Sequence, residues 1–117
     1  MRKGVELMKL TVDSAMIENN NMIKLTGEMV GEYLETLIFA IDEVKSGNNL
    51  PVIIDMAGLT FIDSKGAAFL LNVKQKFNDR KIALAAVPAD VRNTLARLHI
   101  DEQYRIFSNK EEALMRI

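Results

Sequence analysis

Two polar residues, Asp63 and Ser64, follow an apolar segment and precede an amphipathic one. Asp and Ser are favoured at the start of a helix, because their side-chain oxygens accept hydrogen bonds from the free N–H groups of its first turn. That turn also concentrates positive partial charge, which favours an added anion such as a phosphate. Ser64 therefore has two interpretations, as a phosphate acceptor switched by a partner kinase or as a residue that only caps the helix.

A phosphate on Ser64 would add about −1.5 to −2 charge at pH 7. Beside Asp63, this charge would repel an acidic partner surface without any refolding of the chain. Phe61 and Ile62 precede the polar pair, and we expect them to dock this segment onto the core. If one of them is exposed, it would instead anchor a partner.

The sequence lacks the combinations of residues that catalytic sites require. The chain has no cysteine and one histidine, His99, so it shows no metal-ligand cluster or nucleophile–histidine pair. The six glycines fit neither a dinucleotide-binding fingerprint nor a P-loop. We expect Asp55, at the end of an apolar run, to bond to backbone N–H groups of its own loop. The sequence thus predicts a non-enzyme without a cofactor or metal of its own.

Composition narrows the class of protein. The 117 residues favour a single domain over 1–117, with 1–7 as a poorly ordered extension. Lys and Arg (15) balance Asp and Glu (16), which argues against direct nucleic-acid binding. The longest apolar runs, such as 82–87, are too short to span a bilayer, and no signal core follows the basic N-terminus. We expect a cytoplasmic protein without membrane insertion.

The elements that position Asp63 and Ser64 alternate between strands and helices. Alternating apolar residues predict a strand over 8–12, an Asn-rich turn at 18–21 and a returning strand over 22–26 that ends at Gly27. Apolar runs predict further strands, and 3.6-residue periodicity or capping signals predict helices. The expected strands are 51–56, 81–87 and 104–107; the expected helices are 32–46, 64–78, one opened by Pro88 and one after a capping box at 108–111.

This order predicts an α/β fold with about four helices. Strands that alternate with helices imply right-handed crossovers and a mostly parallel sheet, which the opening hairpin makes mixed. Partners of such sheets meet the loops at the carboxyl ends of the strands. The turn at 27–30 and a predicted loop from Met56 to Ser64 should both lie at that end.

The segment from Ile54 to Gly66 resembles the central motif of the STAS family, the domains of bacterial anti-sigma factor antagonists and of sulfate transporter tails. Thr26-Gly27-Glu28-Met29 is similar to the family's Gly-Glu-Leu turn. The order of strands and helices also matches, so the resemblance covers residues 8–117. It implies one STAS-like domain.

In antagonists of this family, an anti-sigma factor that is itself a kinase phosphorylates a serine or threonine in the motif. The unphosphorylated form binds that kinase and frees the sigma factor. The resemblance therefore implies that Ser64 is the phosphoacceptor and that the partner supplies ATP and magnesium. Asp63 would orient and cap, and Gly66 would permit close backbone approach. The implied partner-binding residues are Gly27, Glu28, Met29, Phe61, Ile62, Asp63, Lys65 and Gly66, with the exposed side of the second helix.

Three positions depart from the family pattern. Lys65 stands where members usually carry a second small hydroxyl residue, and Val30 stands where an acidic residue commonly follows the turn. His99-Ile100 replaces the usual Gly-Leu at the end of the third helix. Lys65 adds positive charge where a kinase would sit, or pairs with a phosphate on Ser64. Lys65 and Val30 support an alternative function, a non-phosphorylated STAS subunit of a membrane-lipid transport or stress-sensing complex.

Overall fold

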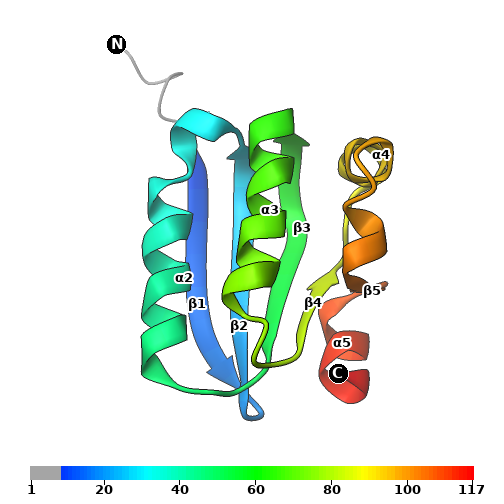
Figure 1. The fold of residues 1–117 in the computed structure, drawn as a ribbon. Helices are drawn as coiled ribbons and strands as arrows, with labels where there is room; N and C mark the ends of the chain where they lie inside the picture. Colours follow the sequence, from blue (N-terminus) through cyan, green and yellow to red (C-terminus); the bar gives the residue numbers. More distant parts are fainter. Residues whose placement is uncertain (1–8) are drawn as a thin grey trace.

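A five-stranded mixed sheet forms the centre of the molecule in the computed structural model, which describes residues 9–117 (Figure 1). The strands are β1 (Leu10–Ile17), β2 (Asn20–Met29), β3 (Val52–Ile62), β4 (Ile82–Ala85) and β5 (Arg105–Phe107), and they lie side by side in chain order. β1 and β2 pair antiparallel, and every later pair is parallel. The predicted α/β class with a mixed sheet is confirmed.

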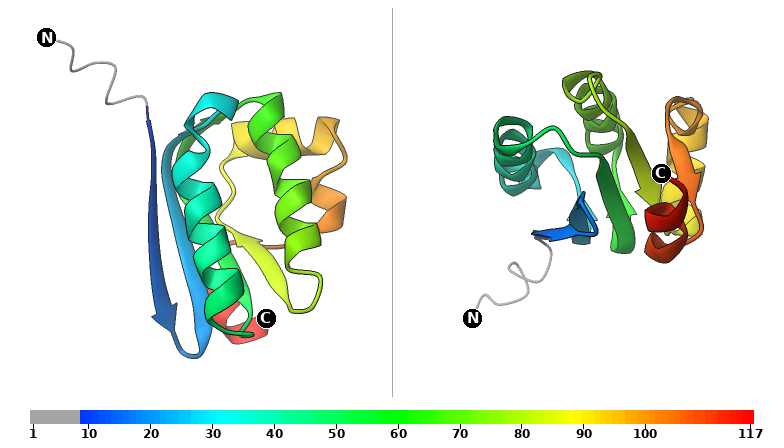
Figure 2. Two further views of the ribbon diagram at one scale, coloured as in Figure 1. Left: turned by 60° about the vertical axis from the view of Figure 1, so that its left-hand side comes forward. Right: turned by 90° about the horizontal axis from the view of Figure 1, so that it is seen from below.

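Four α-helices and two short 3-10 turns connect or follow the strands. They are η1 (Gly31–Tyr33), α2 (Glu35–Gly47), α3 (Ser64–Lys76), α4 (Ala89–Arg97), η2 (Asp101–Gln103) and α5 (Lys110–Arg116). α2 and α3 lie on one face of the sheet and α5 lies on the other (Figure 2). None of the helices in residues 9–117 combines the length and the apolar character that crossing a membrane requires.

Two hydrophobic cores result from this arrangement. The larger one joins alternate residues of β2 and β3 to the apolar stripes of α2, α3 and α4, as Ile23, Ile54, Leu37, Leu70 and Leu95 illustrate. The smaller one lies under α5 and comprises Met22, Ile53, Ala83, Ala85, Phe107 and Ala113. The predicted strand at 51–56 is covered on both faces, as its continuous apolar run requires.

The predicted end of β2 and the predicted loop after residue 56 were wrong. β2 continues through Gly27 to Met29, and β3 continues to Ile62. Two bulges explain the difference: Met56 and Ala57 oppose only Leu25, and Thr60 is an extra residue between Leu59 and Phe61. Bulges leave the strand paired but change which side chains face the core. Val52 to Met56 are all buried, and beyond the first bulge the buried positions are 59 and 62, three residues apart instead of the two of a regular strand.

Other element boundaries shift by a few residues. The predicted strand over 8–12 is observed as Leu10–Ile17, and residues 1–8 lie outside the described part. The predicted Asn-rich turn is shorter and consists of Glu18 and Asn19, both with positive φ. The helix predicted over 32–46 is divided into η1 and α2. The C-terminal cap lies one residue later than predicted, because Asn109 Oδ1 accepts the Glu112 N–H at 2.8 Å.

Candidate partner-binding site

Asp63 joins the end of β3 to the start of α3. It is the N-cap residue, and its Oδ1 accepts the Gly66 N–H at 2.7 Å while its carbonyl accepts the Ala67 N–H at 2.9 Å. The predicted cap is confirmed for Asp63. Ser64 is instead the first residue of the helix, and the side chain that caps α3 is that of Asp63 alone.

The same residue also connects two segments that are distant in sequence. Asp63 Oδ2 accepts the Gly31 N–H at 3.3 Å, and the Asp63 N–H donates to the Met29 carbonyl at 3.3 Å. Pairing of Glu28 with Phe61 continues this contact along the strands. The ends of β2 and β3 thus lie together, beside the starts of α2 and α3 (Figure 1).

Gly66 permits α3 to begin close to the end of β2. A Cβ atom at this position would overlap the carbonyl oxygen of Met29. Gly27 is required for a different reason, because its φ is +106° and a Cβ there would overlap the carbonyl oxygen of Lys9. The close backbone approach implied for Gly66 is confirmed, and Gly27 serves backbone geometry.

Ser64 is exposed at the first turn of α3, and within residues 9–117 its hydroxyl has no hydrogen-bond partner. Since Asp63 uses its side chain to bond Gly66, nothing requires the Ser64 hydroxyl for the helix cap. Its Oγ is therefore exposed and is not used by the cap. The first turn of a helix also carries positive partial charge that would stabilise a phosphate there.

Lys65 lies beside Ser64 and is also exposed. Its aliphatic stem covers Gly31, since a Cβ atom added to Gly31 would lie 2.8 Å from the Lys65 Cδ. Packing of the stem against η1 keeps the ammonium group near the junction of η1 and α3. A positive charge therefore accompanies the Ser64 hydroxyl at this surface.

Phe61 and Ile62 have opposite surroundings. Ile62 is buried, as expected for a docking residue, whereas the side chain of Phe61 is 51% exposed. Phe61 borders a hollow of about 250 Å³, lined on the other side by Asp90, Val91 and Thr94 of α4. α4 contacts the far half of β3, where β4 has already ended (Figure 1).

The predicted partner-binding residues divide into two groups in this structure. Met29, Ile62 and Gly66 are buried, so their side chains support the surface. Gly27, Glu28 and Asp63 are partly accessible, and Phe61, Ser64 and Lys65 are exposed. The accessible group lies along the ends of β2 and β3 and the first turn of α3. We call this group the strand-end surface.

Sequence reasoning missed four residues that contribute to the strand-end surface. Thr60 Oγ1 donates to the Gly27 carbonyl at 3.1 Å, and the Gly31 N–H bonds to Asp63. Asp90 and Thr94 line the hollow beside Phe61. The Thr60 contact depends on a bulge, the Gly31 contact on the meeting of two segments distant in sequence, and the hollow on the packing of α4. None of these has a local signal in the sequence.

Asp55 and His99 have structural roles here. Asp55 is buried, and its Oδ1 accepts the Ala57 N–H at 3.0 Å inside the first bulge, as predicted. His99 is exposed, with Nδ1 3.0 Å from Glu102 Oε2. Its hydrogen bond to Glu102 and the charge of that carboxylate raise the pKa of His99. In the part of the chain that the structure describes, no three His, Asp or Glu side chains gather as a metal site would require.

Comparison with known proteins identifies the fold. The family model of the STAS domain matches residues 12–113. An anti-sigma-factor antagonist (STAS) domain protein from Planctomyces limnophilus has a similar structure, with a TM-score of 0.81 at 21% identity, covering 89% of this chain and 95% of the other. No significant match is found among curated protein sequences.

The anti-sigma factor antagonist SpoIIAA also has a similar structure, in two chemical forms. The unphosphorylated form gives a TM-score of 0.74 at 19% identity, covering 91% of this chain and 95% of the other. The phosphorylated form, from Bacillus, gives 0.68 at 19% identity, covering 91% and 98%. At these identities the likeness concerns the fold.

Proposed function

Since the chain belongs to the STAS domain family, we propose that it is an anti-sigma factor antagonist, a module that binds a kinase-type anti-sigma factor and is switched by phosphorylation of Ser64. The observation that carries this proposal is the exposed Ser64 hydroxyl at the start of α3, which has no hydrogen-bond partner within residues 9–117. Similar structures of anti-sigma factor antagonists, one of them solved in a phosphorylated form, support it.

The chemistry assigned to this chain is that of an acceptor. The kinase partner would bring ATP and magnesium, and the Ser64 Oγ would take the phosphoryl group. Because the Gly66 and Ala67 N–H groups already bond to Asp63, the phosphate would lie near the remaining N–H groups of Ser64 and Lys65. The helix would not have to move, so the switch would act through charge at the surface.

Phe61 supports the proposed location of the interface. Half-exposed aromatic side chains beside a hollow are typical anchors of protein partners. The phosphoacceptor and this anchor both belong to the strand-end surface, together with Glu28 and Lys65. A partner that covers Phe61 would therefore also meet any charge added to Ser64.

Lys65 favours a second candidate function. Its ammonium group lies on the residue next to Ser64 and would offset part of a phosphate's negative charge. If a phosphate on Ser64 changes the surface charge only a little, it makes a poor switch. The chain would then be a constitutive STAS subunit of a membrane-lipid transport or stress-sensing complex. Neighbouring genes distinguish the two: a histidine-kinase-like ATPase favours the antagonist, and transporter subunits favour the alternative.

The proposal is tested by calorimetric titration of the chain with the histidine-kinase-like ATPase that it expects a neighbouring gene to encode. Three forms are compared: the wild type, Ser64→Asp, and Ser64→Asn as a control of the same shape without the charge. We expect Ser64→Asp to weaken binding about tenfold or more, which corresponds to about 1.4 kcal/mol, and Ser64→Asn to bind like the wild type. Equal affinities for all three forms would contradict the switch and favour the constitutive subunit.

A further inference from the structure

β1 forms a free edge of the sheet. Within residues 9–117 it pairs only with β2, and the views from two sides show no other element along its outer edge (Figure 2). Its eight residues contain no proline and no register shift. A long regular edge of this kind is a template for pairing with another strand.

The outward-pointing backbone groups of β1 can be assigned. The Asn21 N–H donates to the Pro51 carbonyl at 2.8 Å, toward β3. The Asn20 N–H must then point the other way, toward its partner Ile17, and the pattern alternates along the hairpin. The residues that bond to β2 are therefore Thr11, Asp13, Ala15 and Ile17, whereas Leu10, Val12, Ser14 and Met16 direct their N–H and C=O groups outward.

The side chains along this edge are self-complementary. We propose that β1 pairs antiparallel with β1 of a second copy of this chain, about a two-fold axis at Ser14. In that register Met16, which is 53% exposed, lies opposite the half-buried Val12 of the second copy. Asp13 lies opposite Ala15, which leaves no like charges facing each other. Two apolar cross-strand pairs and a continuous hydrogen-bond ladder result.

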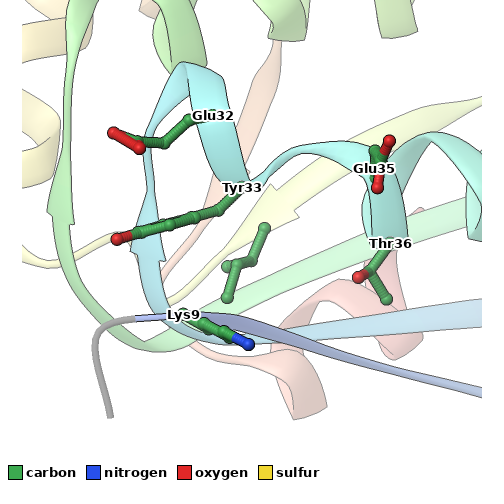
Figure 3. A pocket seen from close by; sticks show the side chains of 6 residues that line it. Lys9, Glu32, Tyr33, Glu35 and Thr36 are labelled. Atoms are coloured by element: carbon green, nitrogen blue, oxygen red, sulfur yellow. The ribbon is translucent and has the colours of Figure 1, made fainter. Parts of the chain in front are cut away.

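Charge also favours this register. Centring the axis on Asp13 would place two carboxylates opposite each other, which is destabilising. Centring it on Ala15 would place Met16 opposite Ser14 and Val12 opposite Glu18, so both apolar pairs would be lost. The Ser14 register keeps both apolar pairs and places Glu18 of each copy opposite Leu10 of the other, at the end of the paired segment. Beside this edge, Lys9 and Leu10 line one side of a hollow of about 230 Å³, and Glu32, Tyr33, Glu35 and Thr36 line the other (Figure 3).

The resulting dimer would have a continuous ten-stranded sheet. Its interface follows the length of β1, whereas the strand-end surface lies on β2, β3 and α3. Pairing would therefore leave Phe61 and Ser64 of both copies accessible. Dimer formation through β1 is thus independent of the function proposed for Ser64.

Cysteine cross-linking tests the register, because the natural chain contains no cysteine. In Ser14→Cys the two cysteines lie opposite each other, with their Cα atoms about 5.5 Å apart, within the range of a disulfide. We expect a covalent dimer under mild oxidation. The matched control Thr11→Cys lies on the same strand, six residues from the position opposite it and so about 20 Å from its copy, and should stay monomeric on a non-reducing gel. Preferential cross-linking of Ala15→Cys would overturn the Ser14 register.

Sedimentation equilibrium tests the association itself, up to the solubility limit of the protein. We expect the wild type to form a dimer and Ser14→Pro to be monomeric, because proline removes an outward N–H at an edge position that tolerates it. Circular dichroism confirms that the variant is folded, and Ser14→Thr serves as a control that should remain dimeric. A monomeric wild type at every concentration, or a folded Ser14→Pro that dimerises like the wild type, would overturn the proposal.

Discussion

The carboxylate of Asp63 accepts hydrogen bonds from two helix starts. Its Oδ1 bonds to Gly66 at the start of α3, and its Oδ2 bonds to Gly31 at the start of η1. Each bond satisfies a backbone N–H at a helix start that would otherwise lack an intrahelical partner. The relative position of the two halves of the strand-end surface therefore depends on a single side chain.

Two replacements of Asp63 should destabilise the domain to different extents, because they remove different numbers of hydrogen bonds. We expect Asp63→Ala, which loses both bonds, to lower the free energy of unfolding by about 1–2 kcal/mol. Asp63→Asn keeps an oxygen for Gly66 but presents an amide NH₂ to Gly31, so its loss should be smaller. Urea unfolding measures both variants. Equal losses for the two would show that the Gly66 bond, which only Asp63→Asn keeps, adds nothing, and an Asp63→Asn as stable as the wild type would show the same for the Gly31 bond.

Gly66 and Gly47 form a matched pair of helical glycines. A Cβ at Gly66 would overlap the Met29 carbonyl, whereas one at Gly47 would meet nothing within 4 Å. We expect Gly66→Ala to cost about 1–3 kcal/mol of overpacking. Gly47→Ala should instead stabilise the domain by up to about 1 kcal/mol, since alanine favours the helix. Thermal unfolding compares them, and a harmless Gly66→Ala would contradict the close approach of α3 and β2.

At the scale of elements, the end of α4 shows why one sequence departure matters. The His99 N–H bonds to the Ala96 carbonyl at 3.0 Å and the Ile100 N–H bonds to the Leu95 carbonyl at 2.9 Å, a Schellman motif. His99 has a φ of 59°, the left-handed conformation that glycine adopts without strain. The glycine usual in the family at this position therefore has a conformational reason.

His99→Gly should stabilise the domain by about 0.5–1 kcal/mol, because it relieves a left-handed conformation that strains other residues. It should also remove a pH dependence. Glu102 raises the pKa of His99 above its ordinary 6.5. The interaction of charged His99 with Glu102 therefore stabilises the domain fully below pH 6.5, and this stabilisation is lost as the pH rises through the pKa of His99 in the folded protein. Urea unfolding at pH values below and above the titration of His99 measures both the gain from glycine and the loss of the pH dependence.

Glu102→Gln is the control for this pH effect. It keeps the left-handed histidine but removes its charged partner, so the pH dependence from His99 should disappear without the gain from glycine. A pH dependence that persists in both variants would have to come from another group.

At the scale of the whole molecule, the two exposed phenylalanines offer a test of which surface binds a partner. Phe61 is 51% exposed on the strand-end surface, and Phe39 is 64% exposed on α2. We expect Phe61→Ala to weaken partner binding about tenfold or more, as loss of a central anchor does. Phe39→Ala should bind like the wild type. Titration calorimetry with the ATPase measures both, and a larger loss from Phe39→Ala would move the interface to α2.

The fold could be predicted where a local pattern determines the element. The β-branched run Val52-Ile53-Ile54 identifies a covered strand, and the stripe of Leu37, Ile41 and Val44 identifies α2. Asp63 likewise has a local signal as a cap. In each case the sequence within one element contains the physical cause.

The two bulges of β3 have no such local cause. Each one is defined by a mismatch in residue number against β2, so it depends on a partner strand far away in sequence. The second bulge decides that Phe61 is exposed and Ile62 is buried. The composition of the strand-end surface therefore became clear only from the pairing of the strands.

Phosphorylation of Ser64 is tested most directly by the intact mass of the protein after incubation with native cell lysate and Mg-ATP. We expect a gain of one phosphoryl group in the wild type and in Ser108→Ala, a control that removes another exposed hydroxyl. The gain should be absent from Ser64→Ala. No gain in an active lysate, or an equal gain in Ser64→Ala, would contradict phosphorylation of Ser64 and leave it as an ordinary first residue of α3.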